Sequence, residues 1–143
     1  MNKELLEKAL EIAIKAHKGQ VDKAGEIYVF HPIRVAQRCE TDDEKIVALL
    51  HDTIEDTDVT EDYLIEQGFP MEIVDAVLGV TREEKETYEE FIRRCALNPL
   101  SRKVKLHDLE DNMDVRRLKE LTEKDMDRLN KYLRAYRYLS AEK

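Results

Sequence analysis

The sequence has few of the residues that interrupt helices, with only 4 Gly and 3 Pro among 143 residues. Leu, Ile and Val recur with regular spacing and 39% of the residues are charged, a balance that favours a compact helical domain over a disordered chain. No apolar run approaches the roughly 20 residues that a membrane helix needs. The first segment is charged throughout rather than signal-like, so we expect a cytoplasmic protein with no membrane partner.

Cysteine and positive charge are also scarce. Cys39 and Cys95 fall in helical patterns, and neither has a second cysteine at zinc-site spacing, so we expect buried, reduced thiols. Lys and Arg total 24 against 32 Asp and Glu, which gives a net charge of −8. Such a chain repels phosphate polymers, so nucleic acid is not expected as a partner, although a local basic pocket could hold a small anion.

Apolar residues recur at intervals of three and four positions, which predicts an all-α, single-domain bundle of six to eight short helices over residues 1–143. Thr41 with Glu44, and Thr87 with Glu90, form capping boxes at two helix starts. The expected helices cover residues 3–18, 31–40, 41–56, 70–80, 88–97 and 100–118, with a short one after Thr60 and a last one after Thr122.

The last expected helix carries an apolar stripe at helical spacing: Leu129, Tyr132, Leu133, Tyr136 and Leu139. Core packing explains this stripe better than a dimer seam, and we expect a monomer or a homodimer.

Four ionisable residues lie at the end of the expected helix 41–56: His51, Asp52, Glu55 and Asp56. Their positions i, i+1, i+4 and i+5 place them on one narrow strip of a helix that is otherwise strongly apolar. Burial of such groups is expensive unless a cation or hydrogen bonds compensate. The strip therefore indicates one chemical cluster, with a solvated acidic face as the alternative for Glu55 and Asp56.

A second polar group lies in the expected helix 100–118, where Asp108 and Asn112 are one turn apart. Asparagine has a poor helix propensity, so a mid-helix Asn indicates a hydrogen-bonding role, with a surface Asn as the alternative. Glu110 and Asp111 are interpreted as solvated charge.

The order of His31, the pair His51–Asp52 and the distant Asp108 resembles the signature of the HD phosphohydrolase superfamily. The segments AHKGQVDKAGEIYVFHP, LLHDTIEDT, GVT and KVKLHDLEDNM are similar to successive motifs in the hydrolase domain of RelA/SpoT enzymes and in small alarmone hydrolases. Together they cover roughly residues 5–118. The resemblance implies an enzyme that removes the 3′-pyrophosphate of guanosine tetra- or pentaphosphate, (p)ppGpp, with one manganese ion.

The resemblance also implies roles for individual residues. Four match the metal ligands: His31, His51, Asp52 and Asp108. Two match the catalytic carboxylates: Glu55 and Asp56. Three match positions that line the substrate pocket: Lys23, Tyr28 and Thr81. Asn112 matches a residue that contacts the nucleotide sugar. We add Arg116, one turn beyond Asn112 on the expected helix, as a phosphate contact.

Two imidazoles and two carboxylates suit manganese, iron, nickel or zinc better than magnesium or calcium. Four protein ligands on an octahedral ion leave two positions for a water and a phosphoryl oxygen. Glu55 or Asp56 would accept the proton of that water. His17 and His107 are interpreted as packed or surface histidines rather than as ligands.

The chain departs from the family pattern in its substrate pocket. Asp22 stands where alarmone hydrolases usually have an arginine that stacks on guanine. Leu109, Asp111 and Asp114 replace Arg, His and Arg, which makes this wall less positive. Two alternatives therefore stay open: an HD nucleotidase or phosphomonoesterase for another small phosphorylated metabolite, and a module that senses a nucleotide without hydrolysing it.

Overall fold

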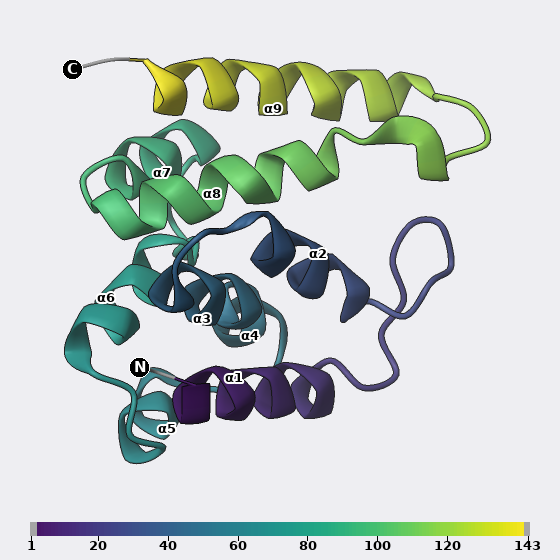
Figure 1. Ribbon diagram of the computed structural model, residues 1–143. Coiled ribbons are helices and arrows are strands. Elements are labelled where there is room, and N and C mark those ends of the chain that lie inside the picture. The colour runs from purple at the N-terminus through teal and green to yellow at the C-terminus, as the bar shows by residue number, and fades with distance from the viewer. Residues whose placement is uncertain (1–2, 142–143) are drawn as a thin grey trace.

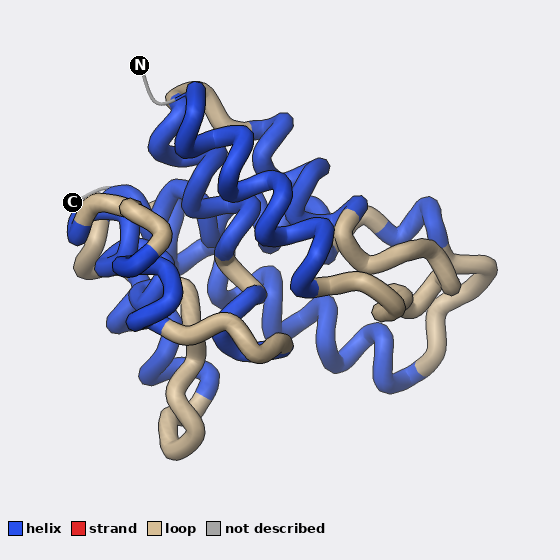
Figure 2. The backbone as a smooth tube through the Cα atoms, turned by 90° about the horizontal axis from the view of Figure 1, so that it is seen from below, coloured by secondary structure: helices blue, strands red, loops and turns tan. Residues whose placement is uncertain are grey.

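The computed structural model describes residues 3–141, and these form helices joined by short loops, without a β-strand (Figures 1 and 2). The prediction of an all-helical bundle is confirmed. The elements in chain order are α1 (Lys3–Ala16), α2 (Phe30–Arg38), α3 (Asp42–Leu50), α4 (Thr53–Asp56), α5 (Glu61–Glu66), α6 (Met71–Gly79), α7 (Tyr88–Cys95), α8 (Pro99–Asn112), the 3-10 helix η1 (Val115–Arg117) and α9 (Glu123–Ser140). None of the described helices has the length and apolar character that a bilayer crossing requires.

Local side-chain hydrogen bonds set the starts of several helices. The side chains of Thr41, Thr87 and Thr122 each accept a hydrogen bond from the third backbone N–H of the helix that follows, and the residue at that position bonds back to the cap. Asn98 caps α8 in a similar way, with Pro99 in its first turn, where no amide is needed. The helix starts inferred from Thr41, Thr87 and Thr122 are confirmed.

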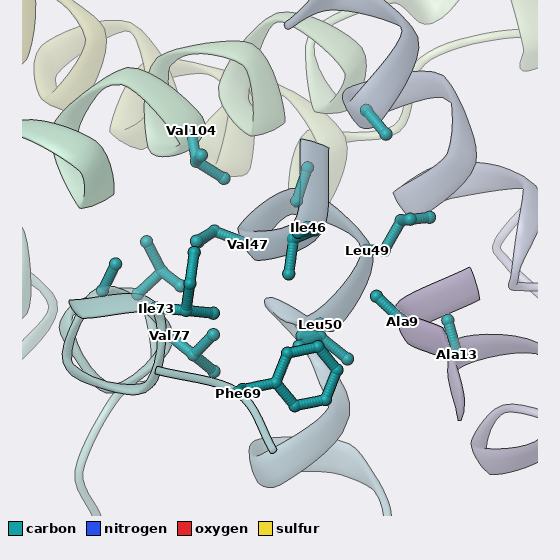
Figure 3. Packing of buried hydrophobic residues seen from close by; sticks show 14 of the residues in the cluster. Ala9, Ala13, Ile46, Val47, Leu49, Leu50, Phe69, Ile73, Val77 and Val104 are labelled. Carbon is teal, nitrogen blue, oxygen red and sulfur yellow. The ribbon is translucent and has the colours of Figure 1, made fainter. Parts of the chain in front are cut away.

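Helix α3 lies at the centre of the bundle and packs against α1, α2, α6 and α8 (Figure 1). Its apolar residues are buried, and Figure 3 shows Val47 between Val104 of α8 and Ile73 of α6. Gly79 allows α6 to approach α8 closely, because a Cβ atom at this position would lie 2.3 Å from Ser101 Oγ. The core therefore holds the C-terminal end of α3 beside the middle of α8.

Helix α9 covers a second apolar cluster with α7 and α8. Its Leu139 and Ala135 are buried against Phe91 and Leu109, while Leu133 is 43% exposed. The expectation of core packing is therefore correct for one side of the stripe in α9.

Candidate metal centre and active site

The predicted continuous helix over residues 41–56 is wrong, because the chain breaks between α3 and α4. His51 and Asp52 connect the two helices, and Asp52 has a non-helical backbone with φ −107° and ψ 2°. Side chains compete for the carbonyls at this point: His51 Nδ1 bonds to Ala48 O, and Thr53 Oγ1 donates to Leu50 O at 2.8 Å. The break turns His51 into the core and puts Glu55 and Asp56 on a separate, solvent-accessible turn.

Three of the predicted metal ligands converge inside the bundle. They are His31 in the first turn of α2, His51 after α3 and Asp108 in α8. All three are buried, and one ligand atom from each lies within 4.8 Å of the others. Asp108 Oδ1 lies 2.8 Å from His31 Nε2 and 3.1 Å from His51 Nε2. Asp52 Oδ2, the fourth predicted ligand, lies 3.2 Å from His51 Nε2 and 3.9 Å from His31 Nε2, and it accepts a hydrogen bond from the Tyr28 hydroxyl.

The hydrogen bonds of the two imidazoles show that the cluster suits a cation. The backbone oxygen of Ala48 can only accept a hydrogen bond, so His51 Nδ1 carries a proton. His31 Nδ1 likewise donates to the carboxylate of Asp111, with 2.7 Å between Nδ1 and Oδ2. If both rings are neutral, the Nε2 lone pairs of His31 and His51 point at the negatively charged carboxylate of Asp108. These three groups repel one another unless a positive charge lies among them. Without an ion, a proton on His31 supplies this charge: burial alone lowers the pKa of His31, but hydrogen bonds to Asp108 and Asp111 raise it to about 9. The donor set therefore fits a divalent metal ion.

Asp111 is completely buried, so its interpretation as solvated charge is wrong. Besides His31, its carboxylate accepts hydrogen bonds from Arg34 Nε at 2.8 Å and Arg34 Nη2 at 3.0 Å. Burial alone raises the pKa of Asp111, and the hydrogen bonds from His31 and Arg34 bring it well below its usual range. Asp111 thus fixes the ring of a predicted metal ligand. A spacing of three from Asp108 is the one signal in the sequence that could have placed it on the buried face.

Lys105 is a second residue of the site; the sequence makes it one of several basic candidates for phosphate contact and does not distinguish it from surface lysines. Its Nζ lies 2.7 Å from Asp108 Oδ2 and 5.2 Å from the centre of the Phe91 ring. Burial alone lowers the pKa of Lys105, but the charge of Asp108 more than reverses this effect. Lys105 therefore remains charged and balances the carboxylate.

Glu55 borders a small cavity of about 170 Å³ beside the metal-ligand cluster. Its Oε1 accepts a hydrogen bond from the backbone N–H of Arg82 at 3.2 Å. Partial burial raises the pKa of both Glu55 and Asp56, which suits proton transfer near neutral pH. Asp56 does not line this cavity. Three cationic side chains do: Arg82, Lys105 and Lys131.

A larger cavity of about 370 Å³ is lined by His31. Three predicted substrate-binding residues line it: Lys23, Tyr28 and Asn112. Tyr28 and Asn112 also line the small cavity, so the two cavities meet at these side chains.

Two predicted substrate contacts and two histidines lie elsewhere. Thr81 Oγ1 donates to Val77 O at 2.7 Å and lines neither cavity. Because α8 ends at Asn112, Arg116 is not one turn beyond it on the same helix, and its side chain is 86% exposed beside Asp114. His17 packs against Tyr28 with ring centres 4.9 Å apart, and His107 Nδ1 lies 2.9 Å from Glu110 Oε1. Both histidines lie outside the ligand cluster.

Residues 9–139 match the model of the HD domain family, so the chain belongs to that family. It is 37% identical over 122 residues to a guanosine-3′,5′-bis(diphosphate) 3′-pyrophosphohydrolase of Aquifex aeolicus, a match that covers 77% of this chain and 17% of the relative. It is 43% identical over 86 residues to a GTP pyrophosphokinase of Myxococcus xanthus, covering 57% of this chain and 11% of the relative. The chain thus spans less than a fifth of these curated relatives.

The fold also matches a solved structure, described as a metazoan ortholog of SpoT that hydrolyses ppGpp. The TM-score is 0.75 at 22% sequence identity, and the match covers 94% of this chain and 84% of the other. The expected resemblance to the hydrolase domain of RelA/SpoT enzymes is confirmed.

Proposed function

We propose that this chain is a metal-dependent phosphohydrolase that cleaves a nucleotide (pyro)phosphate ester, with (p)ppGpp as its model substrate and the 3′-pyrophosphate as the group removed. The observation that carries the proposal is the convergence of His31, His51 and Asp108 beside a cavity bordered by Glu55. The relatives named as 3′-pyrophosphohydrolases from Aquifex aeolicus and Haemophilus influenzae support the choice of substrate.

One divalent ion would be held by His31, His51, Asp52 and Asp108, and manganese is our choice because it accepts mixed nitrogen and oxygen donors. When bound, the ion would supply positive charge that polarises a phosphoryl oxygen and acidifies a water molecule. Asp111 would keep the lone pair of His31 Nε2 directed at the ion, because it holds the proton on Nδ1.

Proton transfer is assigned to Glu55. Its Oε1 already accepts the Arg82 amide, so Oε2 would take the proton of the attacking water as the new oxygen–phosphorus bond forms. The bond between phosphorus and the ester oxygen breaks, and the proton passes from Glu55 to that oxygen. Besides burial, the negative charge of Asp56 raises the pKa of Glu55 and would favour the protonated intermediate state of Glu55.

The cations that line the small cavity, Arg82, Lys105 and Lys131, would balance the negative charge of the pyrophosphate group that is released. Asn112 donates to Asp108 Oδ1 at 3.2 Å and borders both cavities, which suits contact with the sugar that joins the reacting phosphate to the rest of the nucleotide.

A substrate panel tests this proposal. The full chain with manganese should release pyrophosphate from guanosine tetraphosphate, and the same panel should contain NADPH and ordinary nucleotides. Glu55→Gln should lose turnover, whereas Glu61→Gln, in the first turn of α5, should retain it. No product across the panel contradicts the proposal and favours a sensing module. Orthophosphate as the sole product contradicts the pyrophosphate assignment and favours the nucleotidase alternative.

A further inference from the structure

The larger cavity has walls of mixed character. Val21 and Leu118 contribute apolar surface, whereas four cations contribute hydrogen-bond donors: Lys23, Arg34, Arg117 and Arg128. Its volume of about 370 Å³ is in the range of sites for small organic ligands. The apolar surface suits a flat heterocycle, and the four cations suit the phosphate groups that a nucleotide carries beside its base.

Arg34 is held in a fixed orientation at this cavity. Its Nε and Nη2 both donate to the carboxylate of Asp111, which is completely buried and has no freedom to follow a moving arginine. The Arg34 side chain keeps 25% of its surface exposed, and Nη1 takes part in neither of these bonds. The remaining N–H groups therefore form a preorganised donor edge beside the cavity.

The acidic residues of the same cavity are already engaged. Asp22 Oδ1 accepts the backbone N–H groups of Ala24 and Glu26, both at 2.9 Å, so Asp22 shapes the loop. Asp114 accepts Nε and Nη2 of Arg116 at 2.9 and 2.8 Å. Arg34 is thus a preorganised donor of the cavity whose hydrogen-bonding capacity is only partly used. Arg117 also donates to Asp111, but through one bond to its backbone O at 3.2 Å, so it is held less firmly than the doubly bonded Arg34.

A guanidinium group only donates hydrogen bonds, so its partner must present acceptors. The O6 and N7 atoms of a 6-oxopurine form such an acceptor pair, whereas adenine places an amino group at position 6. We propose that Arg34 is a specificity-determining residue that pairs with the acceptor edge of a 6-oxopurine base, and that Asp111 is the positioning residue that fixes Arg34 there. This inference rests on the proposed function in one respect: it assumes that the ligand is a nucleotide.

The test is equilibrium binding of inosine, guanosine and adenosine 5′-diphosphates to the full chain, measured by calorimetry. None of these probes carries a 3′-phosphate, so binding is separated from the proposed reaction. The wild type should bind the inosine and guanosine probes roughly 5- to 150-fold more tightly than the adenosine probe, the range of discrimination from one bidentate pair. Arg34→Met should remove this preference, and Arg34→Lys should remove most of it, because a single ammonium nitrogen cannot present the two fixed, parallel N–H donors of the free Nη1–Nη2 edge.

Arg38→Met is the matched control, because Arg38 also lies on α2 and 3.6 Å from Asp111 but does not line the cavity. It should retain the preference. Asp111→Asn should reduce the preference for the inosine and guanosine probes. Thermal unfolding of this variant shows whether the protein used for the binding measurement is folded. If that variant does not fold, the arginine variants decide the outcome.

Equal binding of the three probes by the wild type would overturn the inference, as would an Arg34→Met variant that weakens all three by the same factor. Loss of the preference in Arg38→Met would also overturn it. A preference that depends on Arg34 in a protein that hydrolyses nothing in the panel would support the inference while removing the proposed reaction.

Discussion

Replacing Lys105 with methionine keeps most of the apolar stem of the side chain and removes its ammonium group beside Asp108. The two side chains are 11% and 5% exposed, and Lys105 Nζ lies 2.7 Å from Asp108 Oδ2. Loss of one partner from a buried ion pair costs about 3–5 kcal/mol. Since His31 and His51 also face Asp108, we expect the lower end, about 3 kcal/mol, and a fall in Tm of roughly 10 °C in the metal-free protein.

Manganese should reduce this cost. An ion held by Asp108 supplies the positive charge that the Lys105→Met variant lacks, so the variant should differ less from the wild type at saturating metal. Urea unfolding with chelator and with manganese measures both differences. Lys103→Met is the matched control on α8, because Lys103 is 62% exposed and lies 3.6 Å from Glu44, and it should change stability by about 0–1 kcal/mol in both conditions.

Two results would refute this reasoning. A cost below about 1 kcal/mol with chelator would show that Asp108 does not depend on Lys105 for its charge balance. An equal cost in the two conditions would show that the ion does not bind next to Asp108.

Three further predictions concern other parts of the molecule. Glu55→Gln should lower kcat by about 10²–10⁴-fold while metal binding, measured by calorimetry, is retained. Arg94 lowers the pKa of Glu86 to about 2, so ionised Glu86 stabilises the fold above its unfolded pKa of 4.5 and the effect is lost as pH falls toward 2. Glu86→Gln should therefore cost about 1–2 kcal/mol at pH 7, with a smaller difference at pH 3 in urea unfolding. Gly79→Ala should cost about 1–3 kcal/mol, and adding Ser101→Ala should recover part of that cost in a double-mutant cycle.

Local signals in the sequence were sufficient to place most helices. The threonine caps act within four residues of themselves, so Thr41, Thr87 and Thr122 reveal three helix starts without tertiary information. The break at His51–Asp52 was not predictable from periodicity, because it depends on side-chain bonds to carbonyls and on the burial of His51 among other helices.

Tertiary contacts explain the other errors at the site. Asp111 lies among charged residues and resembles a solvated acid in the sequence, but its partners His31 and Arg34 come from α2, nearly eighty positions earlier. Arg116 was placed by extending α8 past Asn112, whereas the helix ends there and the chain turns into η1. The convergence of His31 with Asp108 came from a resemblance in motif order, which carries spatial information that hydrophobic periodicity lacks.

Anomalous diffraction from crystals grown with manganese tests the central claim most directly. The account predicts one strong peak within coordination distance of His31 Nε2, His51 Nε2 and a carboxylate oxygen of Asp108. A protein saturated with manganese that shows no peak among these three side chains, or shows its peak elsewhere, would contradict it.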